Sequence, residues 1–183
     1  MMRAIVNGAA GAMGLELQKL LRSGYAGGEI AALIDTKAGD GIVPDFSRVN
    51  VPADIVIDFS FHTATAAAVD YAVKHGLPLV VGTTGHTEEE RNHILSAAEQ
   101  IPVFYTGNMS LGVAVLCKLV RDAAKFFPDA DIEILEIHHN RKADAPSGTA
   151  LMLAKAAATD RPNAEIKCGR AGVGRRQKQD IGI

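Results

Sequence analysis

The stretch RAIVNGAAGAMG, residues 3–14, decides the fold that we expect for the first part of the chain. Residues 3–7 form a short apolar run that is typical of a buried β-strand. Residues 13–21 then place apolar side chains on one stripe of a helix, which ends near Gly24. A strand, a glycine-rich turn and a helix in this order predict a first βα unit.

Three glycines, Gly8, Gly11 and Gly14, lie in the turn of this unit, with the spacing G-x-x-G-x-x-G. Glycine permits a tight turn and lets the backbone approach a pyrophosphate, whose charge is then met by N–H groups at the helix N-terminus. The turn therefore predicts a dinucleotide site. The alternative is a simple glycine-rich βα turn that binds no ligand.

Asp35 supports the dinucleotide interpretation, because it ends the next expected strand, residues 29–35, about 20 residues beyond the motif. An acid at this place hydrogen-bonds the ribose hydroxyls of the adenosine, although an Asp at a strand end also caps turns. Lys37 offers a positive charge to a 2′-phosphate, which Asp35 would repel. Both NADH and NADPH stay open as cofactors.

The rest of the first hundred residues continues to alternate between patterns of strands and patterns of helices. We expect strands at 54–59, 77–81 and 103–106, and helices at 62–74 and 87–100. Between residues 36 and 53, where a helix would be expected, a stretch with Pro, Gly and Asp predicts an abbreviated crossover. The alternation predicts an α/β fold with a doubly wound parallel sheet of four or five strands.

The pattern changes after Asn108, where we place a boundary between a dinucleotide-binding domain, 1–109, and a second domain, 110–183. The expected elements of the second domain are a helix at 111–127, a strand at 131–139, a helix at 149–158 and a hint of a strand at 180–183. This mixture predicts an α+β domain. The chain is expected to stop in the middle of an element, so that this domain is truncated.

Composition excludes several classes of protein. The net charge is −2, which gives no positive field for nucleic acid or an anionic membrane surface. Cys117 and Cys168 are far apart in the sequence, which argues against a disulfide framework and a structural zinc site and favours the reducing cytoplasm. We expect a cytoplasmic protein without a metal ion or a membrane span.

Small residues follow two further expected strands at the carboxyl edge of the sheet. In VVGTTG, residues 80–85, Gly82 leaves room for a ligand and Thr84 offers a hydroxyl to the nicotinamide half of the cofactor. The alternative is a capped turn, in which Thr87 and Glu90 form a capping box. Asn108-Met109-Ser110 ends the last strand in the same way, and its alternative is a helix cap made by Ser110.

The densest group of polar residues is EIHHNRKADAPSGTA, residues 136–150. Adjacent histidines on a strand point to opposite faces, so His138 and His139 are unsuited to a shared metal ion. A histidine does titrate near neutral pH, which suits a proton donor that assists hydride transfer. The alternative for a histidine considered alone is an ordinary surface side chain.

These histidines are followed by groups that bind anions. Arg141 and Lys142 are cations in a loop, and Ser147-Gly148-Thr149 offers hydroxyls and unpaired amides at a helix N-terminus. Two such features beside a proton donor predict a small dicarboxylate substrate. The alternative is a solvated charged loop followed by an ordinary helix cap.

Taken together, these motifs resemble the dihydrodipicolinate (4-hydroxy-tetrahydrodipicolinate) reductases of lysine and diaminopimelate synthesis. The resemblance rests on residues 8–14, 58–60, 81–85, 108–113 and, above all, 136–150. It implies a Rossmann-like domain joined to an α+β domain that binds substrate and forms a homotetramer, with NADH or NADPH as the hydride donor.

The resemblance also implies roles for individual residues. His138 would be the general acid and base, with Lys142 as its catalytic partner. The substrate carboxylates would be held by His139, Lys142, Ser147, Gly148 and Thr149, and the cofactor by Gly8, Gly11, Ala12, Met13, Asp35, Gly82, Thr84, Asn108 and Met109. Many members carry Arg or Lys where this chain has Ala12, so the choice between NADPH and NADH stays open.

Two other readings compete with the reductase. A nicotinamide-dependent aldehyde dehydrogenase would need a cysteine nucleophile in an exposed loop, but Cys117 lies in an apolar helix and Cys168 has no histidine near it in the sequence. A non-catalytic fragment that binds the dinucleotide is the second alternative. It is motivated by the family members, which run well past the position of Ile183.

Overall fold

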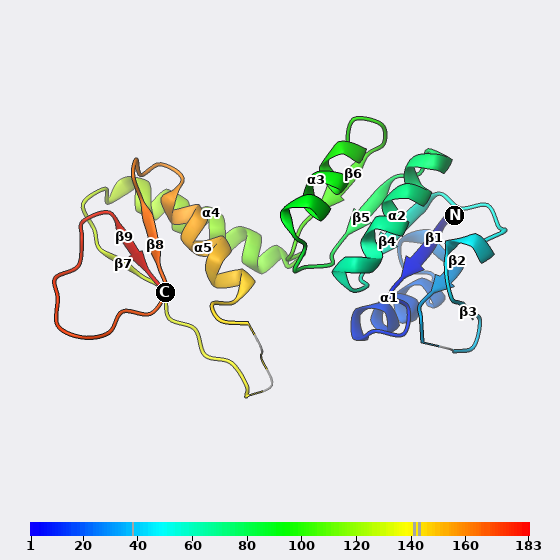
Figure 1. The fold of residues 1–183 in the computed structure, drawn as a ribbon, viewed down its shortest axis with the longest axis horizontal. Helices are drawn as coiled ribbons and strands as arrows, with labels where there is room; N and C mark the ends of the chain where they lie inside the picture. Colours follow the sequence, from blue (N-terminus) through cyan, green and yellow to red (C-terminus); the bar gives the residue numbers. More distant parts are fainter. Residues whose placement is uncertain (38, 141, 143) are drawn as a thin grey trace. The chain divides into compact units, whose positions relative to one another are not determined.

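The computed structural model describes residues 1–37, 39–140, 142 and 144–183. The chain forms two compact units, Met1–Gly107 and Asn108–Ile183, which are described separately. Figure 1 shows the helices and strands of each unit.

The first unit contains a six-stranded sheet whose recorded strand pairs are all parallel. The strands are β1 (Met2–Asn7), β2 (Gly28–Ile34), β3 (Ile42–Val43), β4 (Ile55–Asp58), β5 (Leu79–Val81) and β6 (Val103–Tyr105). Their order, β3-β2-β1-β4-β5-β6, is that of the Rossmann fold. The prediction of a Rossmann-like sheet is confirmed. The sheet has six strands and not the expected four or five, because the two-residue strand β3 also pairs with it.

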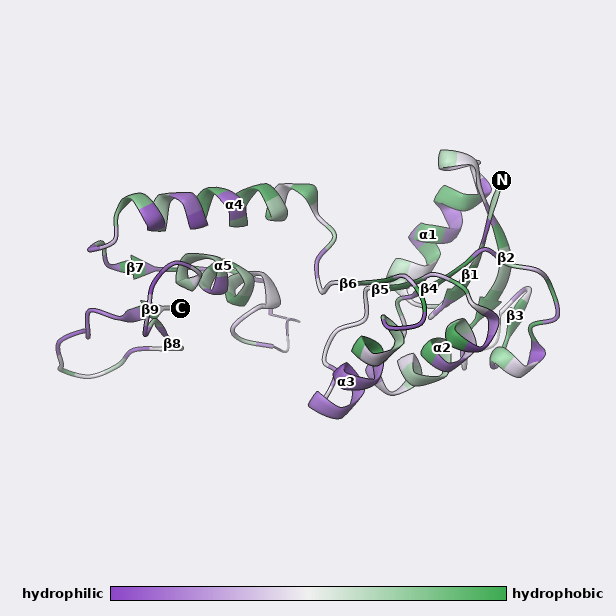
Figure 2. Cartoon of the chain, turned by 90° about the horizontal axis from the view of Figure 1, so that it is seen from above, coloured by the Kyte–Doolittle hydropathy of each residue, from purple (hydrophilic) through white to green (hydrophobic). Residues whose placement is uncertain are grey.

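Helices cover both faces of this sheet, as its alternating side chains require. On one face Ile5 and Val56 pack with residues of α2 (His62–His75) and α3 (Glu88–Ala97). On the other face Ala4 and Val6 pack with residues of α1 (Ala12–Arg22). Figure 2 shows β4 and β5 in the colours of hydrophobic residues, whereas the first turn of α3 is hydrophilic.

The crossover between β2 and β4 is abbreviated, as expected. The crossover contains the short strand β3 and, after it, the 3₁₀ turn η2 (Phe46–Arg48). Another 3₁₀ turn, η1 (Tyr25–Gly27), precedes β2. The carboxylate of Asp45 begins η2 by accepting a hydrogen bond from the backbone N–H of Ser47 at 2.8 Å. Ala38, in the same crossover, lies outside the described residues.

The second unit contains α4 (Leu111–Phe126), α5 (Gly148–Ala158) and a three-stranded parallel sheet. The sheet has the order β7-β9-β8, formed by β7 (Ile132–Glu133), β8 (Glu165–Lys167) and β9 (Asp180–Gly182). The hint of a strand at residues 180–183 is confirmed by β9. We did not expect β8, because its three residues alternate with charged side chains and carry little apolar pattern.

The expected strand over residues 131–139 is wrong beyond Glu133. Burial still alternates from residue to residue as far as Ile137, but strand pairing is recorded only for Ile132 and Glu133, against Ile181 and Gly182 of β9. The backbone N–H of Ile134 adds one hydrogen bond, to the carbonyl oxygen of Gly182 at 2.9 Å. Within the described residues, no partner strand is recorded for residues 135–139. His138 and His139 therefore lie in an irregular segment and not on two faces of a strand.

None of the helices in the described part of the chain combines the length and the apolar composition needed to cross a membrane.

Candidate functional site

The strand order reverses between β1 and β4, and the carboxyl ends of these two strands meet there. Asn7 and Asp58 are paired in the register of the sheet, and Nδ2 of Asn7 donates to Oδ1 of Asp58 at 2.7 Å. Ligands of open α/β sheets bind in the crevice outside the carboxyl ends of strands at such a switch point. The cofactor site expected from the sequence therefore begins at this pair.

The buried carboxylate of Asp58 joins the loops around this crevice. Besides Asn7, the hydroxyls of Ser60, Thr65 and Thr83 donate to it, at 2.6, 2.8 and 2.9 Å. A buried charge is stable only when its lone pairs are occupied in this way. Asp58 thus ties the ends of β1 and β5 to the start of α2.

The glycine-rich turn packs too closely for side chains. Gly8 has a φ of +81°, and a Cβ on it would lie 2.4 Å from the carbonyl oxygen of Phe59. A Cβ on Gly14 would lie 2.2 Å from the carbonyl oxygen of Gly8. Gly11 is the N-cap of α1, and glycine has no side chain that could accept hydrogen bonds from the first-turn amides of the helix. These amides include those of Ala12 and Met13.

A pocket of about 520 Å³ opens beside this turn. Its lining includes Gly8, Gly11, Asp35 and Lys37, three of which were expected to bind the cofactor. Both oxygens of Asp35 accept backbone hydrogen bonds, from Ala10 and from Lys37, each at 2.9 Å. Asp35 therefore fixes the turn and lines the pocket at once, so the capping role and the ligand role are compatible.

Gly82 and Thr84 are not among the residues that line this pocket. A Cβ on Gly82 would lie 2.2 Å from Cε1 of Phe59, and the ring of Phe59 does line the pocket. The methyl of Thr84 is 3.2 Å from the place of a Cβ on Gly107, the last residue of the unit. Thr87 and Glu90 form a capping box at the start of α3. This is the capped turn that the sequence offered as the alternative to a ligand site at residues 80–85.

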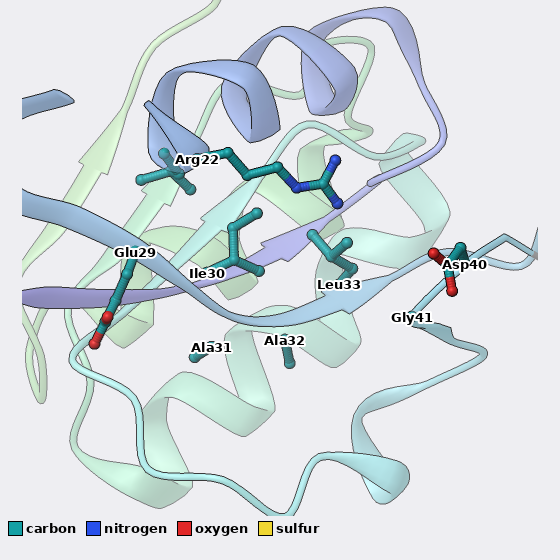
Figure 3. Close-up of a pocket in the computed structure, with 9 residues that line it drawn as sticks. Arg22, Glu29, Ile30, Ala31, Ala32, Leu33, Asp40 and Gly41 are labelled. Carbon is teal, nitrogen blue, oxygen red and sulfur yellow. The ribbon is translucent and has the colours of Figure 1, made fainter. Parts of the chain in front are cut away.

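A second hollow, of about 500 Å³, follows β2 and is lined by Arg22, Glu29 and Asp40 among others (Figure 3). It contains none of the residues expected to bind the cofactor. Figure 3 shows Ile30 and Leu33 on the side of Arg22 and two alanines on the other side of the strand. The hollow exists because β3 pairs only with Leu33 and Ile34, which leaves the rest of that edge of β2 uncovered.

In the second unit, the carboxylate of Glu136 contacts both His138 and Ser147, the residue at the start of α5. Its Oε1 accepts a hydrogen bond from the backbone N–H of Ser147 at 2.7 Å, and its Oε2 lies 3.5 Å from Nδ1 of His138. Hydrogen bonds from Ser147, and then the charges of His138 and Lys142, lower the pKa of Glu136. Glu136 is therefore a carboxylate at neutral pH.

Lys142 is paired with a second carboxylate in the same loop. Its Nζ donates to Oδ1 of Asp144 at 2.7 Å. This hydrogen bond is the largest cause that lowers the pKa of Asp144, and the charge of His138 contributes as well. His138, Lys142, Glu136 and Asp144 thus form one cluster of charges, whereas Arg141 and Ala143 lie outside the described residues.

Four further candidates, Ser147, Gly148, Thr149 and Asn108, lie at or contact the N-terminus of α5. Ser147 is the N-cap, and its Oγ accepts from the backbone N–H of Ala150 at 3.0 Å. Asn108, which was expected to contact the cofactor, donates from Nδ2 to Oγ1 of Thr149 at 3.1 Å. The hydroxyls of Ser147 and Thr149 still have protons to donate, and Gly148 provides a first-turn amide.

Sequence reasoning assigned no role to Glu136, Asp144 or Asp58. Glu136 and Asp144 lie in the polar stretch at residues 136–150, and only their contacts in the structure distinguish them from other surface acids. Asp58 lies inside an apolar run, DIVIDF, and an acid in such a run was the available sign of a buried polar network.

Comparison with known proteins identifies the family. The model of the dihydrodipicolinate reductase N-terminus matches residues 2–109, and that of the C-terminus matches residues 112–183. The chain belongs to the dihydrodipicolinate reductase family. The prediction made from the motifs is thereby confirmed at the level of the family.

Curated relatives of this dihydrodipicolinate reductase family member are 4-hydroxy-tetrahydrodipicolinate reductases. One from Anaeromyxobacter sp. (strain Fw109-5) is 43% identical over 86% of this chain and 65% of its own length. One from Wolinella succinogenes is 40% identical over 100% of this chain and 76% of its own length. The chain thus spans about two thirds of the length of the curated relatives that it matches.

A solved structure shares the fold. The dihydrodipicolinate reductase from Paenisporosarcina sp. TG-14, solved with dipicolinate bound, matches with a TM-score of 0.72. The match covers 100% of this chain and 79% of the other, at 22% identity. At that identity the likeness concerns the fold alone.

Proposed function

We propose that the chain acts in the NADH- or NADPH-dependent reduction of 4-hydroxy-tetrahydrodipicolinate to tetrahydrodipicolinate, in the synthesis of lysine and diaminopimelate. In the overall reaction the substrate accepts a hydride and a proton and loses one water. The observation that carries the proposal is the charged cluster of His138 and Lys142 beside the N-terminus of α5, in a chain of this family.

The first unit fits a nicotinamide dinucleotide. Gly8 and Gly14 let the turn close tightly, because a Cβ on either would meet neighbouring backbone, and the pocket of about 520 Å³ beside the turn is of the size that small ligands occupy. Such a cofactor supplies the hydride when bound. Gly11, Ala12 and Met13 would present first-turn amides of α1 to its phosphates, and Asp35 would meet its ribose.

The nicotinamide half would lie along Gly82, Thr84, Asn108 and Met109. Lys37 and Asp35 both line the pocket where a 2′-phosphate would be placed. A cation and a carboxylate at the same rim oppose one another, which supports use of either cofactor and not a strict requirement for one.

His138 would provide the proton that accompanies the hydride, with Lys142 as its partner. The substrate carboxylates would be held by His139, by Lys142, and by the hydroxyls and amides of Ser147, Gly148 and Thr149. Such a combination of cation and helix N-terminus favours anions. The ion pair with Asp144 positions the Lys142 side chain before the substrate arrives.

We further propose a homotetramer that works in the cytoplasm, without nucleic acid or membrane as a partner. Two observations support these points: both cysteines are free, and α4 carries exposed apolar side chains such as Leu111, Leu119 and Phe126, which an assembly would cover. The molar mass in solution, measured by light scattering, tests the assembly.

The test of activity is oxidation of NADH and NADPH by this chain, with substrate generated in place by the synthase from pyruvate and aspartate semialdehyde. We expect turnover with the chain and a loss of at least about 10²-fold in kcat for His138→Ala and Lys142→Ala, as expected when an acid–base group is removed. Both variants should keep the dissociation constant of the cofactor.

A non-catalytic dinucleotide-binding fragment of the enzyme remains the second candidate, because the chain spans about two thirds of its relatives' length. The two candidates differ in one result. Cofactor binding without turnover, unaltered by His138→Ala, would favour the fragment. Absence of cofactor binding would exclude both.

A further inference from the structure

We propose that Glu136 is the positioning residue of His138: it holds Nδ1 of the imidazole and links it to the N-terminus of α5. The inference rests on the proposed role of His138 as the proton donor. It extends that role to a residue that never touches the substrate.

Glu136 is itself fixed by the fold. Its Oε1 accepts the backbone hydrogen bond of Ser147 at 2.7 Å, and Ser147 is the buried N-cap of α5, with 4% of its surface exposed. A carboxylate at a helix N-terminus is also favoured by the helix dipole. The position of this carboxylate is therefore set by a helix and not by a mobile loop.

The second oxygen of Glu136 is the one available to the histidine. Within the described residues, Oε2 is buried and makes no hydrogen bond. It lies 3.5 Å from Nδ1 of His138, at ion-pair distance. A buried carboxylate oxygen that is otherwise unpaired is stabilised by an N–H directed at it.

This arrangement decides which ring nitrogen does the chemistry. A carboxylate beside Nδ1 favours the form of the imidazole in which Nδ1 keeps its proton. When His138 gives a proton to the substrate, that proton must then leave from Nε2, and the neutral ring that remains still has Nδ1–H facing Glu136. The N–H of Nε2 is thereby the proton donor, and its direction is fixed.

The same carboxylate also couples two parts of the substrate site. One oxygen holds the backbone of Ser147, next to the amides and hydroxyls proposed to bind the substrate carboxylates, and the other faces His138. Anion binding and proton transfer therefore share one rigid support.

The test uses the full chain with ¹⁵N-labelled histidine. NMR reports which ring nitrogen of neutral His138 carries the proton, and it does not require turnover. Glu136→Gln keeps an oxygen that can accept from Ser147 but removes the charge facing the imidazole. We expect the proton on Nδ1 in the wild type and a shift of population towards Nε2–H in this variant.

Two further variants separate positioning from a general loss of structure. Glu136→Asp keeps the charge and should retain part of the Nδ1–H population. Glu165→Gln removes an equal charge from a carboxylate paired with Lys167, and should leave His138 unchanged. Circular dichroism melting checks that all three variants are folded.

In the turnover assay, Glu136→Gln should lower kcat by about ten- to a hundredfold, within the roughly 10²- to 10⁴-fold that general acid–base catalysis supplies. The KM should change less than threefold. An unchanged proton position in a folded Glu136→Gln variant, or an equal change in Glu165→Gln, would overturn the inference. If the tautomer shifts as expected but the wild type shows no turnover, the positioning holds and the proposed reductase activity is what fails.

Discussion

Replacement of Gly14 by alanine tests whether the close packing of the glycine turn is required. Gly14 lies in α1, where alanine normally stabilises a helix by about 1 kcal/mol relative to glycine. Here the added Cβ would lie 2.2 Å from the carbonyl oxygen of Gly8 and 2.8 Å from the Cα and oxygen of Ala9. Ordinary contact begins at 3.4 Å, so the approach is short by about 1.2 Å.

Both obstructing groups belong to the backbone, so neither can rotate away. Relief requires α1 to move from the turn, and overpacking of this kind costs about 1–3 kcal/mol, which outweighs the gain in helix propensity. Real Cβ atoms essentially never approach this closely, so the cost lies in the upper part of that range, at about 2–3 kcal/mol. After subtraction of the roughly 1 kcal/mol gained in helix propensity, we expect Gly14→Ala to lower the free energy of unfolding by about 1–2 kcal/mol. The first-turn amides move with α1, so the dissociation constant of NADH should rise about tenfold, equal to about 1.4 kcal/mol.

Unfolding is followed by circular dichroism in urea, and NADH binding by the fluorescence of the cofactor, which no tryptophan of this chain disturbs. Gly112→Ala is the matched control, because it lies in the first turn of α4 with its nearest neighbour at an ordinary 3.6 Å. That variant should be as stable as the wild type or more so. If Gly14→Ala is equally stable and binds NADH normally, the argument from close packing is refuted.

Three other variants test single contacts. Asp58→Asn removes an acceptor of buried hydroxyl hydrogen bonds, so NADH affinity and the melting temperature should both fall; unchanged values would refute the role of this carboxylate as a support. Arg3 lowers the pKa of Asp54 to about 2, so its stabilisation should be complete above the ordinary value of 3.8 and lost as the pH falls through 2. Asp54→Asn should remove this part of the acid dependence of thermal melting. Gly82→Ala should push the ring of Phe59 towards the pocket, weakening NADH binding in a fluorescence titration more than it weakens folding.

The sheet and the glycine turn could be predicted because their causes are local. An apolar run followed by Gly8, Gly11 and Gly14 specifies a strand, a turn and a helix within a few residues. The capping pairs are equally local: Thr87 with Glu90 begins α3, and Ser110 begins α4, as the sequence indicated.

What could not be predicted depends on partners distant in the sequence. The expected strand at 131–139 has the right alternation, but its recorded pairing is with β9, about fifty residues later, and joins only Ile132 and Glu133 to Ile181 and Gly182. The same holds for Asp58, whose partners lie on β1, on α2 and in the loop after β5. Cys117, which lies in a helix of apolar sequence, is only partly buried, and one side of α4 carries exposed apolar residues.

In the described part of the chain, the helices that begin without a side-chain cap are those that begin at the pocket of about 520 Å³. Side chains cap α3, α4 and α5, through Thr87, Ser110 and Ser147. Among the described helices, α1 and α2 begin without a side-chain cap, at Gly11 and Phe61.

Both of these N-caps line the same pocket of about 520 Å³, beside the switch point of the sheet. First-turn amides that no side chain satisfies must be satisfied by solvent or by a ligand. The N-termini of α1 and α2, which carry a partial positive charge, therefore both lie at this pocket. The phosphates of a dinucleotide would supply the hydrogen-bond acceptors that no side chain supplies to their first-turn amides.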